Sequence, residues 1–266
     1  LDVRPFGHGH INKTYIVIFP TCKYCLQKIN DNVFANPFAV MNNMELVTDH
    51  IRKNVIYSGQ DERTCVLNTI STKYGQTMAI INDEYWRCTR FIEEGVTLDT
   101  TDNPYVIEQA GKAVGQFQRQ LDNFHSRLIV DTIKNFHNTP YRYKTFQDVV
   151  KINRVERVKD CQNEIDFVNE HSEKIDVISK LLHEIKIPER VAHNDTKLNN
   201  VMLDKVTFKA LTLIDLDTVM KGSLLYDYGD ALRYCATTAA EDIKRINPLL
   251  KNAEKSIARQ AIPAAI

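Results

Sequence analysis

The sequence predicts an α+β fold of two lobes, with a strand-rich lobe at residues 1–93 and a mainly helical lobe at residues 94–266. Before the segment "EEGVTLDTTDNP" (93–104), short runs of β-branched and aromatic residues alternate with turns. After it, apolar residues recur every three or four positions, as on one face of a helix. The joint near residues 92–95 is a favoured place for a ligand cleft.

Five runs in the first lobe have the composition of short strands, and turn residues separate them. These runs cover residues 14–19, 24–29, 65–71, 77–81 and 85–92. One helix interrupts them, because Asn36 can cap its first turn and Pro37 suits the first helical position. The apolar residues from Val40 to Ile51 then follow helical spacing. We therefore expect an antiparallel sheet with a single helix.

Three segments of the second lobe have helical periodicity, at residues 105–124, 143–158 and 161–185. Charged and polar residues occupy the positions between their apolar ones. The second lobe is therefore expected to be a helical layer, with one polar segment among its apolar runs.

Composition narrows the class of protein. Charged residues make up 26% of the chain and give a formal net charge of zero, so no global field would attract nucleic acid or an anionic membrane. No apolar run approaches the roughly 20 residues that cross a bilayer, and the amino terminus lacks a basic segment leading into an apolar one. We expect a cytoplasmic enzyme without a nucleic-acid or membrane partner.

The six cysteines are scattered, mostly among apolar residues, and are expected to be buried thiols of a reducing compartment. Cys22 and Cys25 form a C-x-x-C, but on a strand this spacing points the two side chains to opposite faces. No second pair completes a metal site. We expect neither zinc nor redox chemistry at these cysteines.

The polar octet "HNDTKLNN" (193–200) has the spacing of the kinase catalytic loop H-R-D-x-x-x-x-N. In that loop the Asp accepts the proton of the attacking hydroxyl and the Asn holds a metal ion. Asp195 is therefore the candidate base and Asn200 a candidate magnesium ligand. Lys197 can reach the transferring phosphoryl group, and His193 is expected to orient the loop. The alternative is an ordinary polar loop.

A second metal ligand is expected at the end of a strand downstream of the octet. The apolar run "FKALTLI" leads into Asp215, with Asp217 two positions further. Magnesium prefers a few oxygen ligands and keeps its other positions for water and phosphate. Asp215 and Asn200 are therefore predicted to hold magnesium. The alternative role of Asp215 is to cap a turn.

An ATP-dependent kinase also needs a turn that covers the phosphates. "FGHGHINKTYIV" supplies Gly7, Gly9, His10 and Asn12 between two candidate strands, where glycine lets backbone amides approach phosphate oxygens. A lone G-x-G is also typical of a plain hairpin.

A kinase also needs a cation on the strand lobe. Lys28 lies on the next strand and Glu45 on the single helix, the order of the kinase lysine and its glutamate partner. We predict that Lys28 binds phosphates and pairs with Glu45. Solvated positions are the alternative for both residues, and Asp49 or Asn42 could stand where a relative carries the acid.

The chain resembles the aminoglycoside phosphotransferase and choline kinase superfamily, which has a protein-kinase-like fold and acts on small molecules. The resemblance spans residues 4 to about 241 and includes "GHGHINKTYIV", "LQKINDNVFANPFAVMNN" and "WRCTRFIEEG". Its narrowest motifs are "HNDTKLNNVMLD" and "LIDLDTVMKGSLLYDYGDALRY". Within the superfamily, these stretches resemble the N-acetylhexosamine 1-kinases most.

The resemblance implies transfer of the ATP γ-phosphate to the anomeric hydroxyl of an N-acetylhexosamine, with Mg²⁺ as the metal. It implies that the backbone near Phe91 and Ile92 meets the adenine and that Asp227 braces the catalytic loop. Asp230 or Arg233 is a candidate sugar contact. The acceptor is thus expected to be a small molecule, most simply a sugar, and the oligomeric state is left open.

Two departures from protein kinases support a small acceptor. Leu216 follows Asp215 where a protein kinase has Phe-Gly, and no A-P-E motif follows. Two alternatives stay open: a kinase of another small alcohol, such as an aminoglycoside, choline or homoserine, and a non-catalytic nucleotide-binding module. No acidic block marks the helical lobe, which favours a neutral sugar over a cationic acceptor. The intact Asp195, Asn200 and Asp215 argue against the non-catalytic module.

Overall fold

The structure is a computed structural model that describes residues 1–7 and 11–236. The chain forms two compact units, Leu1–Ile133 with Arg190–Ala231, and Lys134–Glu189 with Leu232–Ile266. This division by contacts differs from the predicted lobes, 1–93 and 94–266, because residues 94–133 and 190–231 cluster with the sheet. The lobe boundary itself stays a prediction.

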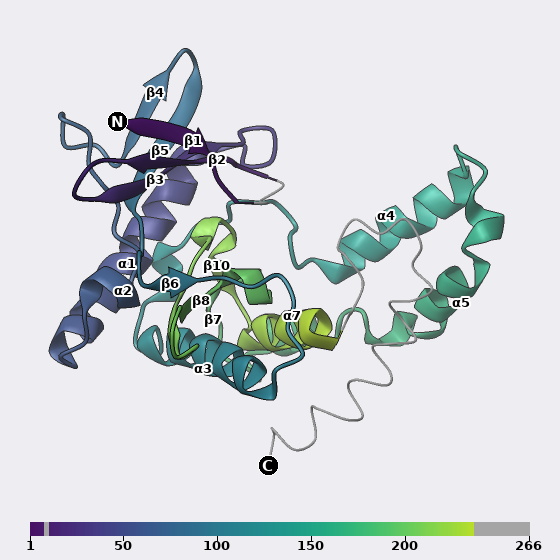
Figure 1. Ribbon diagram of the computed structural model, residues 1–266. Coiled ribbons are helices and arrows are strands. Elements are labelled where there is room, and N and C mark those ends of the chain that lie inside the picture. The colour runs from purple at the N-terminus through teal and green to yellow at the C-terminus, as the bar shows by residue number, and fades with distance from the viewer. Residues whose placement is uncertain (8–10, 237–266) are drawn as a thin grey trace. The chain divides into compact units, whose positions relative to one another are not determined.

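A five-stranded antiparallel sheet forms the amino-terminal part of the first unit (Figure 1). Its strand order is β1-β2-β3-β5-β4. The strands are β1 (Asp2–Pro5), β2 (Lys13–Ile18), β3 (Lys23–Ile29), β4 (Met78–Ile81) and β5 (Glu84–Arg90). The expected α+β class with an antiparallel sheet is confirmed.

Register decides which side chains share a face of this sheet. Gln27 on β3 lies opposite Arg87 on β5, and Lys28 lies opposite Trp86. Because successive side chains of a strand point to opposite faces, Gln27 and Arg87 share one face and Lys28 and Trp86 share the other. The Gln27 side chain accepts a hydrogen bond from Arg87 Nε at 3.0 Å, as the shared face requires.

Helix α1 (Pro37–Tyr57) packs on the face that carries Arg87. Its first turn is capped as predicted, since the Asn36 side chain accepts a hydrogen bond from the Ala39 N–H at 3.1 Å. The Phe38 ring meets the ring of Tyr85, and Met44 Sδ lies 3.7 Å from Arg87 Nη1. The apolar face of the helix is buried and consists of Val40, Met41, Met44, Val47, Ile51 and Val55.

The rest of the first unit places the polar octet. Helix α3 (Pro104–Gln120) packs on a three-stranded sheet of order β6-β8-β9. Its strands are β6 (Gly95–Val96), β8 (Val201–Asp204) and β9 (Ala210–Leu213). A separate two-stranded sheet pairs β7 (Arg190–Ala192) with β10 (Met220–Gly222), and helix α7 (Leu224–Ala236) follows β10. The octet thus lies between β7 and β8.

The predicted strand at residues 65–71 is wrong as a regular element. The short helix α2 (Glu62–Cys65) takes up its first residue, because the Asp61 side chain caps the helix at the Arg63 N–H. Thr69 makes an isolated bridge to Thr89, and the Ile70 N–H donates to the Cys88 carbonyl. Residues 66–71 therefore run beside β5 without forming a regular strand.

The described part of the second unit contains helices α4 (Thr139–Ile152), α5 (Gln162–Glu170) and α6 (Val177–His183). Helix α4 begins before the predicted residue 143 because the Asn138 side chain caps it at the Tyr141 N–H. It ends at Asn153, whose φ of 44° is left-handed. The predicted helix 161–185 is instead two helices, separated by the 3₁₀ turn Ser172–Lys174.

Among the described helices, none has the length and apolar character needed to span a membrane. The cysteines whose side chains the structure describes are free thiols and are partly buried. Burial raises the pKa of Cys88 to about 11.

Candidate active site

The octet is held at its first residues by the carboxylate of Asp227, at the start of α7. The backbone N–H groups of His193 and Asn194 donate to its two oxygens, at 3.0 Å and 2.7 Å. The Thr196 hydroxyl donates to the Asp227 carbonyl at 2.7 Å. Asp227 is completely buried. Burial raises the pKa of the Asp227 carboxyl, although the two N–H donors oppose the change.

His193 joins the octet to the strand that precedes Asp215. Its Nε2 lies 2.9 Å from the Ile214 carbonyl oxygen, and the Asp195 N–H donates to its Nδ1 at 3.3 Å. These partners assign the neutral tautomer with the proton on Nε2. The buried ring also contacts the Phe117 ring of α3. His193 therefore orients the loop, as the sequence predicted.

Asp195, Lys197 and Asn200 meet around one carboxylate oxygen. Asn200 Nδ2 donates to Asp195 Oδ2 at 2.8 Å and to the Asp195 carbonyl at 2.9 Å. Lys197 Nζ lies 3.3 Å from the same Oδ2. The predicted base, its ammonium neighbour and the predicted amide ligand thus lie together.

Asp215 follows β9 and is tied to the octet through its neighbour. The Ile214 N–H donates to the Asn200 carbonyl at 2.9 Å. Asp215 has φ 61° and ψ 60°, a left-handed conformation that costs a residue other than glycine roughly 1 kcal/mol. Such a conformation persists where neighbouring contacts fix it, which is typical of functional sites.

The electrostatics of Asp215 suit a bound cation. Burial, then the nearby carboxylate of Asp217, raises the pKa of Asp215 to about 6, while the Arg87 guanidinium opposes the shift. Asn200 uses its Nδ2 on Asp195, which leaves Oδ1 at the other end of the amide. Carboxylate and amide oxygens are the ligands that magnesium takes in proteins. The donor set of Asn200 and Asp215 therefore fits Mg²⁺.

Asp217 is a third acid near the site and is fully paired. Its Oδ1 pairs with Arg87 Nη1, and its Oδ2 accepts from Asn12 Nδ2 at 2.6 Å. Both partners of the ion pair are buried. Burial alone would lower the pKa of Arg87, but the Asp217 carboxylate outweighs it and holds that pKa above its ordinary value.

The predicted pair of Lys28 and Glu45 is wrong. The Lys28 ammonium pairs with the Glu84 carboxylate, and Glu45 Oε1 is buried without a hydrogen-bond partner among the described residues. Lys28 lies on the face of the sheet opposite to Arg87, by the alternation of side chains along β3. Its role in binding phosphate was predicted from the order of motifs, which does not determine the face.

Arg87 is the residue that sequence reasoning missed. It lies in the run "WRCTRFI", which supplied the adenine contacts but no cation. The signal that could have found it is cross-strand register, because the pairing of Gln27 with Arg87 places a guanidinium on the face that packs against α1.

The glycine turn is described only at its ends. Gly7 has a φ of 77°, a conformation that glycine adopts without strain. Gly9 and His10 lie outside the described residues. Asn12, at the far end, donates to Asp217 and accepts the Asn30 N–H at 3.0 Å. The turn is therefore attached to the Asp215 region through Asn12.

Phe91 and Ile92 form the connection that leaves β5. The Phe91 ring packs edge-on against Phe6, with centroids 5.4 Å apart, and Ile92 is buried. The Phe91 N–H donates to the Lys23 carbonyl at 3.1 Å. The predicted adenine contact and the start of the glycine turn therefore lie side by side.

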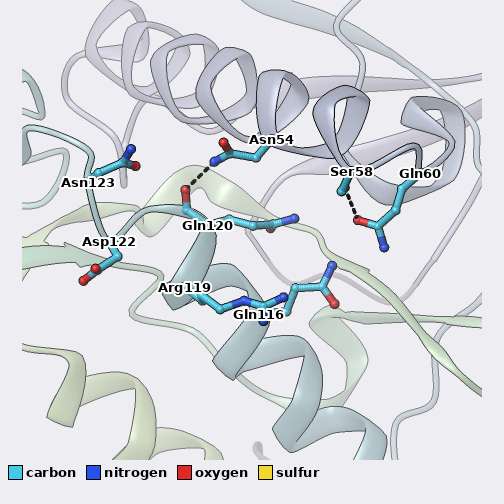
Figure 2. Close-up of a pocket in the computed structure, with 8 residues that line it drawn as sticks. All are labelled: Asn54, Ser58, Gln60, Gln116, Arg119, Gln120, Asp122 and Asn123. Atoms are coloured by element: carbon cyan, nitrogen blue, oxygen red, sulfur yellow. Dashed lines mark hydrogen bonds between the residues drawn. The ribbon is translucent and has the colours of Figure 1, made fainter.

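A polar cavity of about 590 Å³ lies elsewhere in the first unit, at the ends of α1 and α3 (Figure 2). Asn54 Nδ2 donates to the Gln120 carbonyl across it at 2.8 Å. The residues that line it are Asn54, Ser58, Gln60, Gln116, Arg119, Gln120, Asp122 and Asn123. None of the predicted site residues is among them, so volume alone does not locate the candidate site.

Solved structures share this fold. The amicoumacin kinase hAmiN, in complex with AMP-PNP, Ca²⁺ and Ami, matches with a TM-score of 0.60 at 13% identity, over 97% of this chain and 72% of that one. A microcompartment-associated aminopropanol kinase matches with a TM-score of 0.60 at 12% identity, over 97% and 75% of the two chains. An aminoglycoside phosphotransferase from Alicyclobacillus acidocaldarius matches with a TM-score of 0.57 at 10% identity, over 96% and 74%.

These likenesses establish a kinase-like fold and, at such low identity, no more than the fold. The sequence supplies the family. The profile of the Phosphotransferase enzyme family, APH, matches residues 2–248, which include the sheet, the octet and Asp215. The chain therefore belongs to the Phosphotransferase enzyme family.

Proposed function

We propose that the protein is an ATP- and magnesium-dependent kinase that phosphorylates the hydroxyl group of a small molecule. The observation that carries the proposal is the shared oxygen of Asp195, which Asn200 contacts at 2.8 Å and Lys197 at 3.3 Å. A base, an ammonium and an amide ligand on one loop are what phosphoryl transfer requires of a protein.

Each residue has a distinct part in the proposed reaction. Asp195 accepts the proton of the attacking hydroxyl through Oδ1, the oxygen that takes part in neither of these two contacts. Lys197 places positive charge beside the base, within reach of a transferring phosphoryl group. Asn200 and Asp215 are the proposed metal ligands. Magnesium, when bound, would neutralise charge on the phosphates.

The nucleotide is proposed to lie where the glycine turn and the end of β5 come together. The edge-on contact of Phe6 with Phe91 supports this location, because it sets the adenine-binding connection beside the turn. Gly7, Gly9, His10 and Asn12 are the proposed phosphate-covering residues. The structure of the amicoumacin kinase contains AMP-PNP, an ATP analogue, which makes ATP the simplest donor.

The acceptor is proposed to be an N-acetylhexosamine, phosphorylated on its anomeric hydroxyl. The support is the resemblance carried by "HNDTKLNNVMLD" and "IDLDTVM", together with a helical segment that has no acidic block for a cationic acceptor. The Asp230 carboxylate accepts the N–H of Thr196, the residue after the base, at 2.8 Å, and Asp230 is a candidate sugar contact.

The test is an ADP-release assay with free hexosamines, N-acetylhexosamines, choline, homoserine and aminoglycosides, each with Mg²⁺ and with excess EDTA. We expect turnover with an N-acetylhexosamine and Mg²⁺ only. The product should be a non-reducing sugar whose phosphate is released by mild acid, as a 1-phosphate requires. If only choline or an aminoglycoside led to ADP release, the proposed sugar acceptor would be wrong, but the proposed kinase activity would stand.

The assay needs a catalytic control on the same fold. Asn199→Ala is suited to this, because Asn199 lies on the same turn and its Nδ2 contacts the Asp99 side chain rather than Asp195. Asp195→Ala should abolish ADP release, whereas Asn199→Ala should retain it. ADP release that persists in Asp195→Ala would come from a different site. Absence of turnover with every acceptor and donor would contradict the proposed function.

A further inference from the structure

The side chains of two separate segments meet at a carboxylate of a third. Asn12 ends the glycine turn, Arg87 lies on β5, and Asp217 belongs to the 3₁₀ turn Leu216–Thr218 directly after Asp215. Arg87 and Asn12 contact different oxygens of Asp217. We call these residues the Asp217 triad.

The contacts of Asp217 indicate what it does. Two Asp residues spaced D-x-D suggest at first that both are metal ligands. However, both carboxylate oxygens of Asp217 are engaged by Arg87 and Asn12, and only about 2% of the residue is exposed. A metal would have to displace a buried guanidinium to reach it. Asp217 is therefore an anchor, whereas Asp215 remains the candidate ligand.

The anchor fixes the turn that carries Asp215. The Thr132 hydroxyl donates to the Asp217 carbonyl at 2.9 Å, and the Thr218 hydroxyl donates to the His193 carbonyl at 2.8 Å. Asn194 Nδ2 donates to the Thr218 carbonyl at 2.9 Å. The turn is thereby held on one side by the sheet and the glycine turn, and on the other side by the octet.

A purely structural reason for the triad is weak. Taking two charges out of water is costly, and a buried ion pair is often no better for stability than apolar side chains of similar size. The pair lies next to Asp215, the candidate metal ligand, whose backbone is left-handed. The pair is better explained as a device that orients this ligand, because metal affinity depends on such groups.

We infer that Arg87 and Asp217, with Asn12, position Asp215 for the metal–nucleotide complex, and that Arg87 connects the sheet to the site. This rests on the proposed function. Arg87 is a positioning residue, because it acts through Asp217. Through Asn12, the connection also joins the described end of the glycine turn to the turn that follows Asp215.

The test replaces the buried pair by apolar side chains of similar size. In the double variant R87M/D217L we expect a folded protein, since the charges are removed together. Its melting temperature should fall only by the loss of the hydrogen bonds to Asn12 and Gln27. We expect Mn²⁺ to bind in the presence of ADP about 10- to 100-fold more weakly, the usual effect of losing a ligand-orienting partner. Free Mn²⁺ can be measured by electron paramagnetic resonance, without turnover.

A kinetic readout separates positioning from chemistry. The Mg²⁺ concentration for half-maximal activity should rise by a similar factor in R87M/D217L, while activity at saturating Mg²⁺ should fall much less. Arg87→Lys keeps the charge but not the planar fork, so its Mn²⁺ affinity should lie between those of the wild type and the double variant. If the double variant does not fold, this single variant carries the test.

Two controls fix the interpretation. Val55→Ala removes buried apolar volume from α1, where Val55 is completely buried, and should lower stability without changing Mn²⁺ affinity. Wild-type Mn²⁺ affinity in R87M/D217L, or a larger loss in Lys28→Met, would overturn the inference and leave the kinase proposal intact. A wild-type protein that binds no Mn²⁺ with ADP would instead contradict the proposed function.

Discussion

The segment from His193 to Thr218 and the helices α4 to α6 differ sharply in how they are held. In the first, His193, Asn194, Thr196 and Asn200 are buried polar residues with bonds to Asp227, Ile214 and Asp195. In residues 134–189, by contrast, the buried residue is Ile165 alone. The exposed apolar residues of this segment include Val149 and Ile152 on α4, and Val155 and Ile185 in the connections.

The difference follows from what each region has to do. Phosphoryl transfer depends on positioning, and a displacement of about 1 Å can cost about 100-fold in rate. A loop that carries the base therefore needs its polar groups fixed by buried bonds. Helices α4 to α6 carry none of the predicted catalytic or nucleotide residues, so their side chains need no such support.

The largest expected effect tests the first region. Asp195→Asn should lower turnover by roughly 10² to 10⁴, the usual worth of a positioned base. Nucleotide binding should change little, because an amide can still accept the hydrogen bond from Asn200. Steady-state kinetics and a binding titration measure the two quantities.

The matched control for Asp195→Asn comes from the second region. Asp148→Asn changes an exposed aspartate of α4 in the same way and should leave turnover unchanged. A variant of Asp195 that is as fast as the wild type would remove the proposed base. A slow Asp148 variant would show that the helices take part in the reaction.

The grouping of the three octet side chains could be predicted from the sequence because they lie on one local segment. Asp195, Lys197 and Asn200 lie within one turn, so their spacing alone brings them together. The position of Asp215 follows from the end of the apolar strand before it. The hydrogen bond from the Ile214 N–H to the Asn200 carbonyl connects this strand end to the octet. Local spacing therefore sufficed for the parts of the site that one chain segment builds.

The cation on the sheet could not be predicted in this way. Whether Lys28 or Arg87 faces the site depends on cross-strand register, and a shift of one residue exchanges the two faces. The same limit explains the predicted helix 161–185, where apolar periodicity continues through the 3₁₀ turn Ser172–Lys174. Periodicity reports which residues could share a face, not where hydrogen bonding stops.

A smaller effect is expected at the residue that supports the loop. Asp227→Asn places an N–H₂ group against the N–H of His193 or of Asn194, so one buried donor loses its acceptor. The cost should be about 1–3 kcal/mol of unfolding free energy. Urea denaturation measures it. Asp176→Asn, at the residue before α6, where the aspartate pairs with exposed Lys180, should not shift the midpoint measurably.

The pH dependence of that cost sharpens the comparison. Because the pKa of Asp227 is raised in the fold, the folded state holds this proton more tightly than the unfolded chain. The resulting stability is present below the ordinary pKa and is lost as pH rises through the folded pKa. The cost of Asp227→Asn should therefore be larger at pH 5 than at pH 8. A cost that grows with pH would mean a depressed pKa and a favoured carboxylate.

The smallest expected effect tests whether the exposed apolar residues of helices α4 to α6 contribute to stability. Val149 on α4 is 63% exposed, whereas Val201 on β8 is fully buried. Val149→Gln should change the free energy of unfolding by less than about 0.5 kcal/mol. The better helix propensity of Gln favours a slight stabilisation. Val201→Ala should cost about 1–3 kcal/mol, from lost burial and a residual cavity.

The two valine variants are compared by the same urea denaturation. If Val149→Gln destabilises the protein as much as Val201→Ala does, the exposed side chain must be covered in solution. Helices α4 to α6 would then be a packed region like the catalytic segment, and the contrast between the two regions would fail. A near-zero effect would instead mean that these helices tolerate change at their surface.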